Sequence, residues 1–317
     1  MSTPLTYRGH IRAILTLGLP LIGGHLGQVA IGVTDTVMMG WYSIEGLAAV
    51  TLASTFFFVL LIFGSGFAWA VMPLVASFHA EGDEVAIRRA TRMGVWLSLA
   101  FAALSLPLMI WSAPLLRLMG QGDALAQDAG RYLVVAGWGI FPGLLLMTLK
   151  SYLAALERTQ VVFLVTLAAA IVNALANYAF ISGNWGAPEL GVTGAALASV
   201  VTQTVSLIGV VVYILWKVPQ HQLFLRLWRP DAQMLARVFR LGWPIGLTAL
   251  SEVGLFAGSA VLMGWLGTVP LAAHGIAVQL SSITFMVTSA SPTPRPSGRA
   301  MPSAAATRRG WRAAPSP

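Results

Sequence analysis

Two apolar stretches of this chain begin with closely similar residues that lie 224 positions apart. The first begins Leu17-Gly18-Leu19-Pro20 and the second Leu241-Gly242-Trp243-Pro244. Further along, Met39-Gly40-Trp41 returns as Met263-Gly264-Trp265 without a gap. Both stretches are long enough to span a membrane as a helix, and both have a proline near the start. The repeat therefore indicates a duplicated arrangement of transmembrane helices.

The composition supports a membrane protein. Of 317 residues, 57% are hydrophobic and 9% are charged, whereas soluble domains carry about 25% charged residues. We therefore expect an all-α polytopic membrane protein. The chain has no cysteine and its five histidines are scattered, so we expect neither disulfides nor a thiolate metal site. The polar start runs into an apolar stretch too long for a cleavable signal peptide, so we expect the first helix to remain as an anchor.

Windows of about 20 apolar residues predict eight membrane-spanning helices. They lie near residues 12–39, 46–78, 90–116, 128–155, 159–181, 190–217, 234–264 and 268–287.

The basic residues at the helix ends and in the loops fall mainly on one side of the membrane. That side holds Arg8, Arg12, Arg88, Arg89, Arg92, Lys150, Arg158, Lys217, Arg226, Arg229, Arg237 and Arg240, and the other holds Arg117 and Arg131. This bias predicts a cytoplasmic N-terminus. Because the net charge of +8 is spread over separate loops, we expect no nucleic-acid partner.

Six predicted helices separate the two starts of the repeat, so both copies begin on the same side of the membrane. This favours a parallel repeat of six-helix bundles, as in some secondary transporters. We expect a complete first bundle at 1–217, a linker at 218–233, and the first two helices of a second bundle at 234–287. The linker mixes apolar residues with arginines. It is either an amphipathic segment on the cytoplasmic surface, facing anionic lipid, or an ordinary connector.

Residues 288–317 are rich in Pro, Arg, Ser and Ala and hold no acidic residue. We expect a disordered tail there, since such a sequence cannot form a spanning helix. If relatives complete the duplication, four more helices follow Val287 in them. Our hypothesis is a shift of the reading frame near Val287 that truncates the second bundle. The alternative is a genuine basic tail.

Of the eleven acidic residues, only Asp35 and Glu252 lie inside apolar spans. A charge in mid-membrane costs roughly 2.5–3.5 kcal/mol, so such residues usually face a cavity and bind ions, protons or cationic ligands. Glu252 aligns with Gln28 in the repeat and Asp35 with Ser259, and each helix carries its pair on one face. Their oxygen ligands suit a proton or Na⁺, and Na⁺ at Asp35 or Glu252 is the one metal ion we expect. The alternative is that each acid is only hydrogen-bonded within the bundle.

Asn173 and Asn177 form a second polar pair, one helical turn apart in apolar surroundings. Buried amides need hydrogen-bond partners. The pair either joins neighbouring helices or belongs to the same polar cavity as Asp35.

Prolines and glycines within the spans predict bends and close contacts. Pro20 and Pro244 are repeat equivalents and predict a shared hinge. Glycines four residues apart favour close helix packing, and they form the pairs Gly23/Gly27, Gly242/Gly246 and Gly254/Gly258. No catalytic motif is present, so we expect neither an enzyme nor a cofactor.

Several of these residues occur in order in one known family. Asp35-Thr36-Val37-Met38-Met39-Gly40, Asn173-x-x-x-Asn177-Tyr178, Gly191-Val192-x-Gly194 and Glu252-Val253 resemble motifs of the multidrug and toxic compound extrusion transporters, in their bacterial NorM-like branch. The resemblance implies two six-helix bundles around a central cleft, which export small cationic, amphipathic compounds in exchange for Na⁺ or H⁺. It also implies a bacterial inner-membrane location, and we expect a monomer.

The resemblance implies a role for individual residues too. Asp35 matches the first-helix acid that couples the cation or proton, Asn173 and Asn177 match the polar residues beside it, and Glu252 matches the acid that binds the cation in the second bundle. Two alternatives remain. A lipid-precursor flippase of the same superfamily would need a strongly basic cavity, and a non-transporting membrane fragment would show no dye efflux.

Overall fold

The computed structural model describes residues 7–225 and 227–266, together with residues 277 and 281. All regular structure in these residues is helical. The elements are α1 (Tyr7–Tyr42), α2 (Ile44–Glu81), α3 (Glu84–Ile110), α4 (Ser112–Leu118), α5 (Asp123–Ala155), α6 (Thr159–Ser182), η1 (Asn184–Gly186), α7 (Val192–Lys217), η2 (Pro219–His221) and α8 (Ala232–Leu266).

Five of these helices, α2, α3, α5, α6 and α7, are long and apolar enough to cross a membrane. This confirms the prediction of an all-helical, multi-pass membrane protein. The spans predicted at 12–39 and 234–264 correspond to α1 and α8, and the span at 268–287 and the tail at 288–317 lie outside the described residues.

One predicted span was wrong at its end. The helix expected at 90–116 ends at Ile110, and a separate short helix, α4, begins at Ser112. Pro114 explains the break. In a continuous helix residue 114 would donate its backbone N–H to the carbonyl of Ile110, but proline has no N–H and its ring would clash with that carbonyl.

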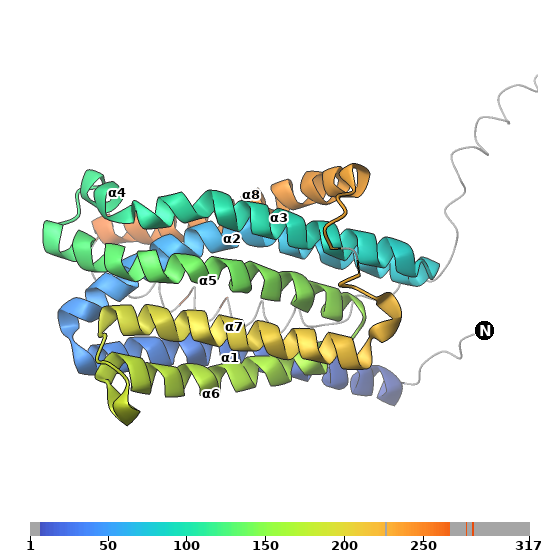
Figure 1. The fold of residues 1–317 in the computed structure, drawn as a ribbon, viewed down its shortest axis with the longest axis horizontal. Helices are drawn as coiled ribbons and strands as arrows, with labels where there is room; N and C mark the ends of the chain where they lie inside the picture. Colours follow the sequence, from blue (N-terminus) through green and yellow to red (C-terminus); the bar gives the residue numbers. More distant parts are fainter. Residues whose placement is uncertain (1–6, 226, 267–276, 278–280, 282–317) are drawn as a thin grey trace, which may run out of the picture.

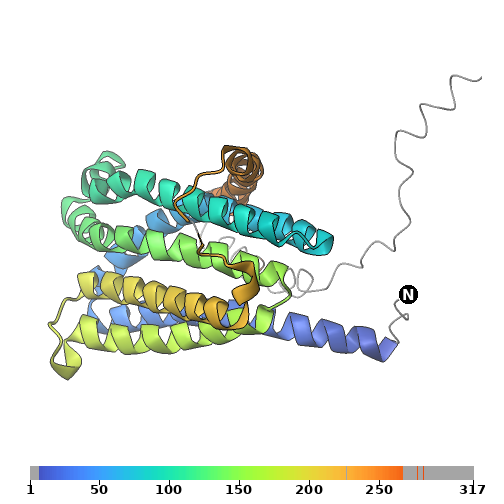
Figure 2. The same ribbon diagram turned by 45° about the vertical axis from the view of Figure 1, so that its right-hand side comes forward.

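The long helix α5 lies in the middle of the bundle (Figures 1 and 2). It packs against α2 and α3 on one side and against α7 on the other, while α1 packs against α6. Side chains from these helices form two buried hydrophobic clusters. One contains Phe78, Tyr152 and Leu223, and the other contains Met39 and Ile181.

Helix α8 docks on α2 through glycines at very short range. A Cβ added to Gly66 would lie 2.4 Å from the backbone nitrogen of Gly246, and a Cβ added to Gly246 would lie 2.5 Å from the carbonyl oxygen of Phe63. A Cβ added to Gly242 would likewise lie 2.9 Å from the Cα atom of Phe67. The packing role predicted for Gly242 and Gly246 is therefore confirmed.

We expect Gly246→Val to destabilise the protein strongly, because the added carbons meet backbone atoms that cannot move aside. Overpacked cores lose about 1–3 kcal/mol. Thermal unfolding in detergent measures the loss. Gly254→Val on the same helix is the matched control, since a Cβ there meets no atom of the described residues within 4 Å. Equal melting temperatures for the two variants would contradict this packing.

The linker between α7 and α8 packs tightly against the bundle. Val218 and Leu223 are buried in the hydrophobic cluster of Phe78 and Tyr152. His221 is also buried, 2.6 Å from the Tyr152 hydroxyl through its Nδ1 atom, and burial lowers the pKa of this histidine. The bundle therefore holds the start of the linker firmly against α5.

An ion pair fastens the end of the linker to α3. The Arg89 Nε atom donates a hydrogen bond to the Asp231 carboxylate. Asp231 also accepts a hydrogen bond from the Met234 backbone at 3.1 Å, at the start of α8. Arg89 lowers the pKa of Asp231 below the ordinary value of 3.8. The pair thus contributes stability above about pH 4, and this contribution is lost as the pH falls through the lowered pKa of Asp231.

We expect Asp231→Asn to loosen the linker, because it removes this charge-assisted bond. Chymotrypsin cleavage after the exposed Trp228 should become several-fold faster at pH 7. The control is Asp128→Asn, which removes an exposed carboxylate 3.4 Å from Arg131 on α5. Equal cleavage rates in Asp231→Asn and the unmodified protein would show that the pair does not hold the linker.

Candidate functional site

Asp35 lies on α1 where this helix packs against α6. The Nδ2 atoms of Asn173 and Asn177 donate hydrogen bonds to its Oδ1 atom at 2.9 and 2.6 Å. Asn177 Nδ2 also lies 3.2 Å from Asn173 Oδ1. Both asparagines are fully buried. The structure therefore joins three residues of the predicted site, far apart in the sequence, into one polar cluster.

Small residues bring α1 and α6 close enough for these bonds. A Cβ on Gly23 would lie 2.5 Å from the ring of Phe163, and one on Gly27 would lie 3.1 Å from the side chain of Thr166. The pair Gly23/Gly27 thus packs closely, as predicted. On α6, Asn173 and Asn177 are one turn apart and both face α1.

Two oxygen atoms of the cluster are left over after these bonds. In the described part of the chain, Asp35 Oδ2 accepts no hydrogen bond, and Asn177 Oδ1 is buried without a partner. The amide orientation of Asn177 follows from its Nδ2 atom, which donates to both neighbouring oxygens. The buried Asn177 Oδ1 without a partner is costly, and the half-buried Asp35 keeps Oδ2 open to a proton or a cation.

Tyr132 on α5 is a neighbour that sequence reasoning missed. It is 6% exposed and lies within electrostatic range of Asp35. A single tyrosine in an apolar helix gives no sequence signal, because most such residues pack or sit at the membrane interface. Only the folded bundle brings α5 toward the carboxylate on α1.

The other predicted site residues lie apart from this cluster. Gln28 is exposed, two turns before Asp35 on α1, and Glu252 is exposed on α8, which contacts α2 and α3 rather than α1. No hydrogen bond or ion pair joins Glu252 to another residue in the described ranges. Pro244 lies inside α8, which continues through it, and the side chain of Pro20 is outside the described part.

No group of three or more His, Cys, Asp or Glu side chains gathers among the described residues. The polar groups of the cluster are one carboxylate and two amides. Such hard oxygen donors suit a proton or an alkali cation.

A family model matches the segment that contains this cluster. The MatE model covers residues 20–179, which is half of the chain, and includes Asp35, Asn173 and Asn177. The chain belongs to the MatE family. The polar cluster therefore lies in the part of the chain that the family model matches.

Curated relatives extend the match beyond this range. This MatE chain is 43% identical to a probable multidrug resistance protein NorM of Agrobacterium fabrum, and 45% identical to one of Rhizobium meliloti. Each alignment covers 88% of this chain and 60% of the relative. The chain thus spans about three fifths of the length of these relatives.

Solved structures share the fold. A eukaryotic MATE transporter superposes with a TM-score of 0.75 at 16% identity, covering 89% of this chain and 62% of that one. An outward-facing multidrug resistance MATE transporter superposes with a TM-score of 0.72 at 21% identity, covering 88% and 62%. At these identities the likeness shows the helical arrangement, and the family assignment rests on the sequence matches.

Proposed function

We propose that this chain forms the larger part of an efflux antiporter, which exports small cationic, amphipathic compounds in exchange for Na⁺ or H⁺. The observation that carries the proposal is the Asp35 cluster, with its two oxygen atoms left over between α1 and α6. The names of the relatives, probable multidrug resistance proteins, support the substrate class.

In this mechanism the incoming cation and the exported compound compete for the same carboxylates. The ion binds Asp35 Oδ2 and Asn177 Oδ1, while Asn173 and the Nδ2 atom of Asn177 hold the carboxylate in place. Each charge that moves inward gains about 2.3 kcal/mol per 100 mV of membrane potential. Binding of the ion weakens the site for the organic cation, because one negative charge cannot neutralise both.

Glu252 supplies a second carboxylate for the cation on α8. We further propose that Pro20 and Pro244 act as equivalent hinges and that Gln28 faces the same pathway as Glu252. The predicted arrangement completes the proposal: domains at 1–217, 218–233 and 234–287, a monomer in the inner membrane of a bacterium, and a cytoplasmic N-terminus. The positive-inside bias and the repeat support this arrangement.

Ethidium efflux from cells tests the proposal. One strain expresses the 317-residue chain, and a second expresses the same chain extended after Val287 with the remaining residues of the Agrobacterium relative. We expect the extended chain to lower cellular ethidium relative to an empty vector. Equal ethidium in the extended-chain and empty-vector strains, with the protein present in the membrane, would overturn the proposal. Efflux by the 317-residue chain itself would show that the additional residues are not required.

A further inference from the structure

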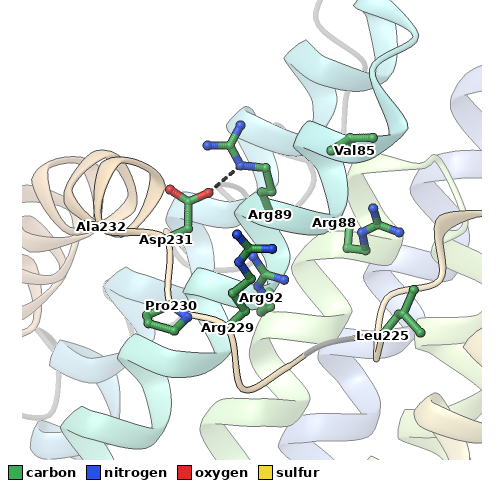
Figure 3. A pocket seen from close by; sticks show the side chains of 9 residues that line it. All are labelled: Val85, Arg88, Arg89, Arg92, Leu225, Arg229, Pro230, Asp231 and Ala232. Carbon is green, nitrogen blue, oxygen red and sulfur yellow. Dashed lines mark hydrogen bonds and ion pairs between the residues drawn. The ribbon is translucent and has the colours of Figure 1, made fainter.

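A basic cavity of about 530 Å³ lies between α3 and the end of the linker. Figure 3 shows its charged lining, in which Arg88, Arg89 and Arg92 come from α3 while Arg229 and Asp231 come from the linker. The function proposed above uses none of these residues. The four arginines come together because three of them lie within the first turns of one helix and the linker returns across that helix.

The charge of this cavity is strongly unbalanced. Asp231 is the one acidic residue of the lining, and it pairs with Arg89. Arg92 is 8% exposed; Asp231 attracts its charge, whereas Arg88, Arg89 and Arg229 repel it. Guanidinium groups bind phosphate oxygens through paired N–H donors. An anion with several oxygens would therefore relieve the repulsion.

A second cavity, of about 230 Å³, adjoins the first and is almost purely apolar. Arg92 lines both cavities, at the boundary between them. The walls of the second cavity, apart from Arg92 and Thr91, are aliphatic side chains of α3, α5 and α7. The linker residues Leu223, Phe224 and Leu227 complete these walls. The same linker thus borders a basic cavity and a neighbouring apolar one.

The linker is placed for contact with a membrane surface. The Trp96 indole donates a hydrogen bond to the Leu227 carbonyl at 2.7 Å, which fixes the linker on α3. Trp228 is 77% exposed beside it, and exposed tryptophans are typical of the membrane–water interface. With Trp228 at that interface, both cavities would lie where lipid headgroups meet acyl chains.

We propose that these two cavities form a binding site for an anionic phospholipid, with the headgroup phosphate on the arginines and part of an acyl chain in the apolar cavity. A free phosphate ion shares the headgroup chemistry but leaves the apolar cavity unused. A zwitterionic lipid fills the apolar cavity but brings a cation next to four arginines. The combination of the two cavities selects a lipid with net negative charge.

Lipid retention by the purified 317-residue chain tests this site. Native mass spectrometry in detergent compares phosphatidylglycerol with phosphatidylcholine of the same acyl chains. We expect a strong preference for phosphatidylglycerol. Each surface arginine contributes about fivefold to the binding of anionic lipid, so the double variant Arg88→Gln/Arg229→Gln should lower its retention on the order of thirtyfold. Equal retention of the two lipids by the unmodified protein would overturn the proposal.

Four further arms separate this site from general charge effects and from free phosphate. Arg131→Gln removes an exposed arginine at the other end of the bundle and should leave retention unchanged, whereas a loss equal to that of the double variant would overturn a local site. Arg88→Lys/Arg229→Lys keeps the charge but loses the paired N–H donors, and should restore only part of the retention lost in the double variant. Val95→Phe fills the apolar cavity and should lower lipid retention. Inorganic phosphate that displaces the lipid at equal concentration would indicate an anion site alone and overturn the lipid proposal.

Discussion

Asp35→Asn in the extended chain is expected to abolish ethidium efflux driven by an ion gradient, with a fall of at least about tenfold. The substitution keeps the size of the side chain but removes the negative charge that an inward-moving cation or proton requires. It also places a third amide beside Asn173 and Asn177. In the unmodified protein, the Nδ2 atoms of these asparagines donate to the Asp35 carboxylate at 2.9 and 2.6 Å. Initial rates of efflux from energised cells measure the effect.

Asp128→Asn is the matched control for this prediction. It makes the same chemical change at an exposed carboxylate near the start of α5, where the partner is Arg131 at 3.4 Å. We expect efflux close to that of the unmodified extended chain. If Asp35→Asn retained full efflux at equal membrane abundance, the coupling role of Asp35 would be wrong.

Glu252→Gln is expected to abolish cation-driven efflux by removing the carboxylate of α8. Glu252 is exposed in the described part of the chain, twelve residues beyond Arg240 and therefore about 18 Å along the helix. In the proposed orientation Glu252 lies near the middle of the bilayer, where a carboxylate without a function is costly. Efflux rates under an imposed gradient of Na⁺ or of pH measure the loss.

Thr248→Ala, one turn earlier on the same helix, is the control for Glu252. Its hydroxyl donates to the Pro244 carbonyl at 2.8 Å, within α8 itself, so its removal changes the helix surface without removing a charge. We expect near-normal efflux. Unchanged efflux in Glu252→Gln would count decisively against a second cation site on α8.

The sequence predicted the helices well because their signal is local. Seven of the eight predicted spans correspond to long helices, and a few helix starts follow cap residues. Asp83, for example, accepts the Ala86 backbone N–H at 2.8 Å at the start of α3. The break before α4 was missed because Pro114 lies in an apolar run that hydropathy reads as continuous.

The polar cluster was predictable in part. The Asp35 carboxylate and the two amides one turn apart all need hydrogen-bond partners within apolar spans. This requirement favours hydrogen bonds between them. Tyr132 was not predictable, since its proximity depends on how α5 packs within the bundle. The basic cavity was also hidden, because the sequence shows its arginines in two separate segments and only the linker conformation brings Arg229 over α3.

Transport by the extended chain in proteoliposomes tests the central claim most directly. Gradients of Na⁺ and of pH are imposed separately, and ethidium movement is followed for the unmodified protein and for Asp35→Asn. We expect that one of the two gradients drives ethidium movement and that Asp35→Asn abolishes it. Ethidium movement that is independent of both gradients, or equally fast in Asp35→Asn, would contradict the account.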